Sequence, residues 1–171
     1  MHNLGMKEHF LLVMAPVSFT TAASVTGYVD LSGVEDCTFL LNVGTCASSS
    51  TTNTLVTVEA SSAAASNASE VQIICNYRKS SALATDAFAS VTAMVTAAAG
   101  VPLVPTTDAN KIVLIDVDPS VVIGATANKN GRYVRLVITP NAQTTATIIG
   151  VTAIMTPMYA GVTMVSAITA S

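Results

Sequence analysis

Apolar and polar residues alternate with a period of two along several short stretches of the chain. In the stretch 37–43, Phe39, Leu41 and Val43 share one face, and polar residues interrupt the other. This alternation is typical of a β-strand with one buried face. The same pattern predicts strands at 28–33, 54–60 and 71–77, the last two pairing across the small-residue segment 61–69.

The last third of the chain has the clearest strand patterns. We expect strands at 110–118, 132–140 and 145–155, joined by loops that contain Pro119, Asn130-Gly131 and Pro140-Asn141. Proline, asparagine and glycine are turn residues, so these loops separate the three strands clearly.

The segment 85–100 mixes helix-favouring Ala and Met with strand-favouring Val and Thr. We interpret it as irregular or strand-like, with a short helix behind an Asp86 cap as the alternative. Pro102 and Pro105 follow, and because proline cannot donate to a strand ladder they exclude a central strand there.

About eight strands without long helices predict an all-β fold, an antiparallel β-sandwich of jelly-roll-like connection. We divide the chain into an extended N-terminal arm at 1–26, a β-sandwich domain at 27–160 and a C-terminal tail at 161–171. No internal repeat is present.

The strand that begins at Arg132 is unusual because both of its faces are apolar. Its beginning overlaps the short stretch 129–135, which holds three of the seven Lys and Arg residues of the chain. We expect Arg132 and Arg135 to cover the sheet with their aliphatic stems and to pair with Asp116 or Asp118. A neighbouring subunit is the alternative partner.

Charged residues make up only 10% of the chain, against about 25% in a typical soluble domain. A surface of hydroxyl and methyl groups is easily desolvated, so this composition indicates either a subunit of an assembly or a secreted Thr-rich domain. The net charge of −3 argues against nucleic-acid binding, which needs a dense basic surface.

Metal and redox chemistry have few candidates. Cys37, Cys46 and Cys75 have no zinc-ligand spacing, and we expect free thiols, with a Cys37–Cys46 bridge across a hairpin as the alternative. Asp116 and Asp118 share one strand face and could bind Ca²⁺, but we interpret them as a strand end or as arginine partners. We therefore predict no metal and no cofactor.

Catalytic motifs are also missing. His2 and His9 are the only histidines, and neither lies near a serine or cysteine in a nucleophile context. The sequence contains no G-x-S-x-G, H-E-x-x-H or phosphate-binding glycine motif. We predict that the chain is not an enzyme.

The N-terminal apolar run 10–17 is too short to span a bilayer, which takes about twenty residues. It also makes a weak secretory signal, because Glu8 offsets Lys7. We expect an extended arm or edge strand that orders against a partner, with no membrane contact.

Two blocks of sequence resemble the opening and closing parts of small β-sandwich structural proteins of tailed bacteriophages, the capsid decoration, cement or head-stabilisation proteins. The first block is GYVDLSGVEDCTFLLNVGT, and the second comprises IDVDPSVV, NGRYVRLVITP and ATIIGVTAIMTPMYAG. The likeness covers about half of the chain. The middle, EASSAAASNAS, departs from the Ser/Asp-rich turn and following Trp or Phe of that family.

The resemblance implies a virion protein on the head surface, assembled in the host cytoplasm. Its partners would be the major capsid protein and further copies of itself, as a homo-trimer or homo-dimer. The interface residues that we expect are Phe10, Leu11, Leu12, Tyr133, Arg135 and Tyr159. The alternatives are a head-fibre or adhesin-type module that binds host-surface polysaccharide, and a major shell or tube subunit.

Overall fold

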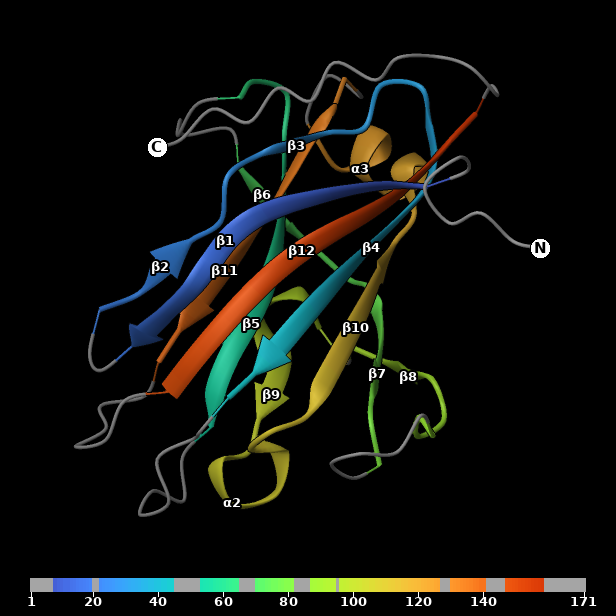
Figure 1. Cartoon of the computed structure of the whole chain (residues 1–171). Helices are drawn as coiled ribbons and strands as arrows, with labels where there is room; N and C mark the ends of the chain where they lie inside the picture. Colours follow the sequence, from blue (N-terminus) through green and yellow to red (C-terminus); the bar gives the residue numbers. More distant parts are fainter. Residues whose placement is uncertain are drawn as a thin grey trace.

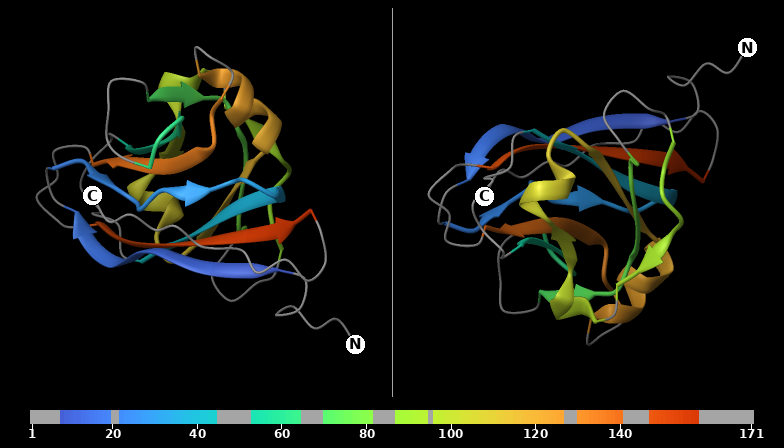
Figure 2. Two further views of the ribbon diagram at one scale, coloured as in Figure 1. Left: turned by 90° about the horizontal axis from the view of Figure 1, so that it is seen from above. Right: turned by 90° about the horizontal axis from the view of Figure 1, so that it is seen from below.

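Two six-stranded antiparallel sheets, called sheet A and sheet B, pack face to face (Figure 2). The computed structural model describes residues 8–19, 22–44, 53–64, 70–81, 87–94, 96–126, 130–140 and 147–158. The predicted all-β sandwich is confirmed, whereas its jelly-roll connection stays a prediction.

Sheet A lies at the front of Figure 1 and sheet B behind it. In spatial order, sheet A contains β1 (His9–Phe19), β12 (Thr147–Pro157), β4 (Val34–Val43), β10 (Ile112–Val117), β7 (Asn76–Lys79) and β8 (Thr92–Ala93). Sheet B contains β2 (Ser24–Val25), β11 (Tyr133–Thr139), β5 (Thr54–Ser61) and β6 (Val71–Ile73), with β3 (Val29–Asp30) paired to β11 and β9 (Val101–Leu103) paired to β5. The short helices are η1 (Ala97–Ala99), α2 (Pro105–Asp108) and α3 (Pro119–Ala125).

The core lies between the sheets and is built from the inward positions of the predicted alternating strands. On β4, Phe39 and Leu41 are fully buried, and on β11 so are Val134, Leu136 and Ile138. Each fully buried Val, Leu, Ile or Phe side chain stabilises the fold by roughly 1.5–3 kcal/mol relative to exposure. The apolar alternation therefore supplies the main driving force that holds the two sheets together.

The N-terminal segment expected as an arm contributes strands to both sheets. β1 pairs along β12, and its residues Val13 and Met14 are buried in the core. β2 pairs with β11 in the other sheet. The described residues of segment 1–26 are thus built into the sandwich, β1 in the edge-strand form, while the tail 161–171 lies outside the described residues.

The predicted single strand at 71–77 is wrong in its middle. β6 pairs with β5 in sheet B, as expected, but after Ile74 and Cys75 the chain crosses over, and β7 pairs with β10 in sheet A. The described residues of the segment 85–100 are largely irregular and contain β8 and η1, while Asp86, the expected alternative cap, lies outside the described residues. Pro102 lies in β9, which pairs only with β5 among the described strands, so it interrupts no central ladder.

A helix, α3, occupies the link between β10 and β11 where we expected only a loop. Asp118 accepts a hydrogen bond from the Ser120 backbone N–H at 2.8 Å, and Pro119 is the first helical residue. This is a favourable helix start, because Asp satisfies a free N–H and proline needs none. Val122 anchors the helix in the core with no exposed surface.

The thiols of Cys37 and Cys75 are free and buried. Burial raises the pKa of each thiol to about 12, so both stay protonated at neutral pH. The expected alternative of a Cys37–Cys46 bridge across a hairpin is wrong, because the Cys37 thiol is free. Cys46 itself lies outside the described residues.

Candidate functional site

The outer face of sheet A carries a band of five apolar side chains, which we call the apolar stripe. Its members are Phe10, Leu12, Leu40, Leu114 and Ile154. Phe10 and Leu12 are 53% and 59% exposed, and the other three are half-buried. In Figure 1 this face is turned toward the viewer, and among the described elements no helix or second sheet lies in front of β12, β4 and β10.

The strand register makes the stripe continuous. Leu12 lies opposite Thr152, Thr152 opposite Leu40, and Leu40 opposite Leu114. Phe10 lies opposite Ile154 in the next row. Side chains that are directly opposite on neighbouring strands are in contact range, so the stripe is one surface that spans four strands.

A polar margin borders the stripe at the β7 side. Asp116 accepts a hydrogen bond from the Thr38 hydroxyl at 3.0 Å and forms an ion pair with Arg78 at 3.3 Å. The margin therefore presents neutralised charge beside the apolar surface, an arrangement typical of a protein interface with an apolar centre and polar rim.

Metal binding finds no support in this margin. A depression of about 380 Å³ is lined by Asp36, Asp116 and Asp118 together with Thr38 and Asn76. Asp116 is engaged by Arg78 and Thr38, and Asp118 caps α3. Among the described ranges, no group of three or more His, Cys, Asp or Glu side chains is arranged to hold a metal ion.

The residues that we expected at an interface divide into three groups. Phe10 and Leu12 point outward in the stripe, whereas Leu11 packs against the core. Tyr133 is half-buried and Arg135 is buried, both on sheet B. Tyr159 lies outside the described residues.

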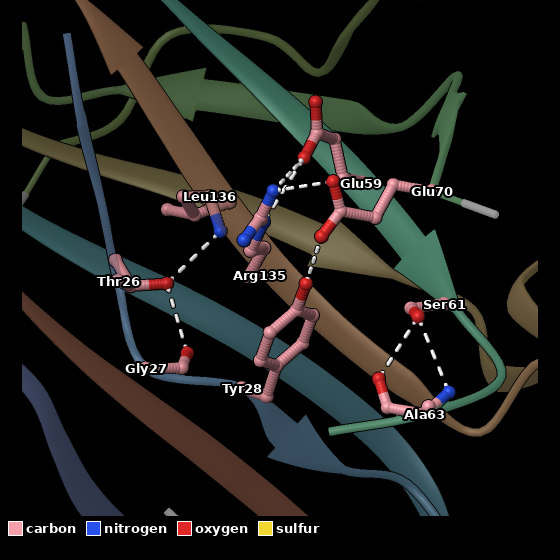
Figure 3. A network of polar contacts seen from close by, with 9 residues as sticks. All are labelled: Thr26, Gly27, Tyr28, Glu59, Ser61, Ala63, Glu70, Arg135 and Leu136. Carbon is pink, nitrogen blue, oxygen red and sulfur yellow. Dashed lines mark hydrogen bonds and ion pairs between the residues drawn. The ribbon is translucent and has the colours of Figure 1, made fainter. Parts of the chain in front are cut away.

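Arg135 belongs to a buried ionic cluster on the outer side of sheet B (Figure 3). Its Nε and Nη2 donate to Glu59 Oε2 at 3.0 and 2.9 Å, and Nη2 contacts Glu70 Oε2 at 2.7 Å. The guanidinium also lies over the ring of Tyr28, 4.9 Å from its centroid. One cation thus joins β11, β5 and the residue that precedes β6.

The Tyr28 hydroxyl completes the cluster by donating to Glu70 Oε1. Burial raises the pKa of Tyr28 above its ordinary value of 10.0, and the hydrogen bond to Glu70 adds to that rise. Two carboxylates and one guanidinium leave one net negative charge, so the neutral phenol is the form that fits beside Glu70.

The expected pairing of both arginines within the chain is correct, but the expected partners are wrong. Arg132 Nε donates to Asp30 Oδ1 at 2.7 Å, and Arg135 pairs with Glu59 and Glu70 rather than with Asp116 or Asp118. Burial would raise the pKa of Asp30, but the hydrogen bonds from Arg132 and Ser32 hold it below its ordinary value. β10 is in sheet A while β11 is in sheet B, so the expected aspartates lie in the opposite layer.

The raised pKa of Tyr28 predicts alkaline sensitivity. Because the unfolded chain loses the phenol proton above about pH 10 while the folded chain keeps it, the free energy of unfolding should fall as pH rises through that value. Tyr28→Phe should remove part of this slope. Urea unfolding followed by circular dichroism between pH 8 and 11 measures it, and identical slopes in the two proteins would contradict the assignment.

Sequence reasoning missed Leu40, Leu114 and Ile154 as surface residues. Each occupies an outward position of a strand whose inward positions are also apolar. Apolar residues on both faces of a strand are the signal that could have identified them, because such a strand needs cover on both sides.

Catalytic and membrane features add nothing to the site. His9 is exposed at the start of β1, and His2 lies outside the described residues. Within the described part of the chain, each helix is too short to cross a bilayer.

No family model, no curated protein and no solved structure matches the chain.

Proposed function

We propose that the chain is a non-enzymatic structural protein of a virus particle, a capsid cement or decoration protein that binds the shell of the major capsid protein. The observation that carries the proposal is the apolar stripe on a sheet face that no described helix or strand covers. The resemblance of the opening and closing sequence blocks to phage decoration proteins supplies the identity of the partner.

The stripe suits a large, repetitive protein surface. The outer face of a six-stranded sheet offers an extended contact surface, and exposed apolar side chains gain free energy when a partner excludes water from them. Many copies on one shell would add up modest individual interfaces through multivalency. A ligand that prefers the mature shell would also raise the stability of that shell.

Sheet B offers less to a partner. Tyr133 meets Tyr28 edge to face with ring centroids 6.5 Å apart, and Arg132 lies over its ring at 5.3 Å. Arg135 forms ion pairs with the carboxylates of Glu59 and Glu70. These side chains already have partners within the chain, so the stripe is the better docking surface.

Particle sedimentation tests the function directly. Virions purified on a gradient from the source lysate should carry this chain at a fixed ratio to the dominant shell protein, measured by quantitative mass spectrometry. Presence only in the soluble fraction would contradict a virion role, and identity with the dominant shell protein would make the chain the shell subunit itself.

A substitution in the stripe tests the docking face. Leu40→Lys should weaken co-sedimentation with shells that lack the protein at least about tenfold, because an unpaired ammonium would be buried against the partner. Thr139→Lys, an exposed position on β11 of sheet B, adds the same charge elsewhere and should leave binding unchanged. Equal binding by Leu40→Lys and the unmodified protein would refute this face, provided that both melt at the same temperature.

A further inference from the structure

One edge of sheet A lies along β1, and the other lies along β8. β1 is a terminal strand of this sheet, and among the described strands it pairs with β12 alone (Figures 1 and 2). An unpaired strand edge is a template for pairing with another strand, and proteins usually protect it with proline, charge, bulges or a covering segment. The presence or absence of such protection therefore indicates whether another strand can pair with this edge.

The second half of the β1 edge is protected. The pairing with β12 shifts register between Leu12 and Met14 and again between Met14 and Val17, and Pro16 lies in the second irregular stretch. The Gly27 backbone N–H donates to the Val13 carbonyl at 3.1 Å, so the chain itself covers the edge at this point. No further strand can extend regularly past Val13.

The first half of the edge has no proline, no bulge and no covering segment among the described residues, and Glu8 at its start is its one acidic side chain. From His9 to Leu12 the register with β12 is unbroken, from His9 opposite Met155 to Leu12 opposite Thr152. This stretch contains no proline and no lysine. Within the described residues, no backbone hydrogen bond from a segment other than β12 reaches residues 8–12.

We infer that this open edge pairs with the same edge of a second copy of the chain, antiparallel about a two-fold axis, with Phe10 opposite the partner's Phe10. In an antiparallel pair, residues directly opposite each other point to the same face of the sheet. Two identical strands related by a two-fold axis meet this condition only when one residue lies opposite its own copy. A register centred on Phe10 uses residues 8–12 alone. A register centred on Leu11 would place His9 opposite Val13, whose carbonyl is already bonded to Gly27.

The segment is compatible with itself. Glu8 would lie opposite Leu12, so the carboxylates of the two copies do not face each other, and His9 would lie opposite Leu11. Phe10, which is 53% exposed, gains an aromatic partner across the new strand pair. The two copies of sheet A would form one continuous sheet whose outer face carries both stripes. This dimer does not depend on the presence of a shell.

A cysteine substitution tests the register. Phe10→Cys should form an inter-chain disulfide with mild oxidant. The substitution is made in a Cys46→Ser background, so that the other thiols are the buried ones of Cys37 and Cys75. Residues directly opposite have Cα atoms about 4.5–5.5 Å apart, within the range of about 4.4–6.8 Å for a disulfide. Leu12→Cys is the matched control, since its two copies would be offset by four residues, about 13 Å, and should not cross-link.

Sedimentation of the isolated unmodified chain should give twice the monomer mass of 17.5 kDa at micromolar concentration. A monomer or trimer mass would overturn the dimer, and equal cross-linking of the Phe10→Cys and Leu12→Cys chains would overturn the register. Leu40→Lys, which lies on β4 away from the edge, should keep the Phe10→Cys cross-link while losing shell binding. The dimer and the docking face can therefore fail separately.

Discussion

Replacing Arg135 with alanine is expected to lower the free energy of unfolding by about 3 kcal/mol. Loss of one partner of a buried ion pair costs about 3–5 kcal/mol, because the remaining charge stays buried without compensation. The lower end applies here, since the Glu59 and Glu70 side chains keep 15% and 16% of their surface exposed. For a chain of this length the melting temperature should fall by about 6–12 °C.

The matched control is Arg132→Ala. Arg132 directly precedes β11 and pairs with Asp30, whose side chain is 8% exposed, but the Arg132 side chain itself is 51% exposed. Solvent screens the exposed Arg132 guanidinium, so this variant should lose less of its melting temperature than Arg135→Ala. Differential scanning calorimetry of the two variants at pH 7 measures the contrast.

A triple variant, Arg135→Met with Glu59→Gln and Glu70→Gln, separates charge from packing. Removal of all three charges leaves no buried ion without a partner, so much of the lost stability should return. Unaltered melting of Arg135→Ala combined with lost shell binding would instead show that Arg135 acts at an interface, contrary to its contacts within the chain.

The strands were predictable from the sequence where one face is buried and the chain stays in one sheet. On β4 and β5 the inward positions are buried as the alternation indicates. At 71–77 the same alternation continued through the crossing between sheets, because Ile73 on sheet B and Cys75 before β7 both face the common core. A period of two reports only burial, so it cannot distinguish a long strand from two strands in facing sheets.

The ionic cluster was predictable only in part. Opposite charges and low charge content indicated that the arginines would find partners, but Asp30 is 102 positions from Arg132, and Glu59 is 76 positions from Arg135. Which carboxylate lies beside which guanidinium depends on strand order, and strand order follows from the crossings of the chain between the sheets. The stripe was missed for a related reason, since exposure of an outward residue depends on what covers the face.

Gly131 has no room for a side chain, because backbone atoms of α3 occupy the position of its Cβ. A Cβ on Gly131 would lie 1.9 Å from the Val122 carbonyl oxygen and 2.8 Å from its carbonyl carbon. Val122 is fully buried in α3, and the Asp118 cap holds the start of that helix. Gly131→Ala therefore requires α3 to move away from the sandwich, and we expect a loss of about 3 kcal/mol, the upper end for overpacking a core.

The same substitution at Gly124 provides the control. Gly124 is also in α3, but a Cβ there meets no atom within 4 Å, and alanine is favoured over glycine in a helix by about 0.8–1.0 kcal/mol. Gly124→Ala should therefore raise the free energy of unfolding while Gly131→Ala lowers it, although each adds one methyl group to the same region. Urea unfolding of both variants measures the difference. If Gly131→Ala proved as stable as the unmodified chain, α3 would not lie against Gly131, and the link between the two sheets would have to be built differently.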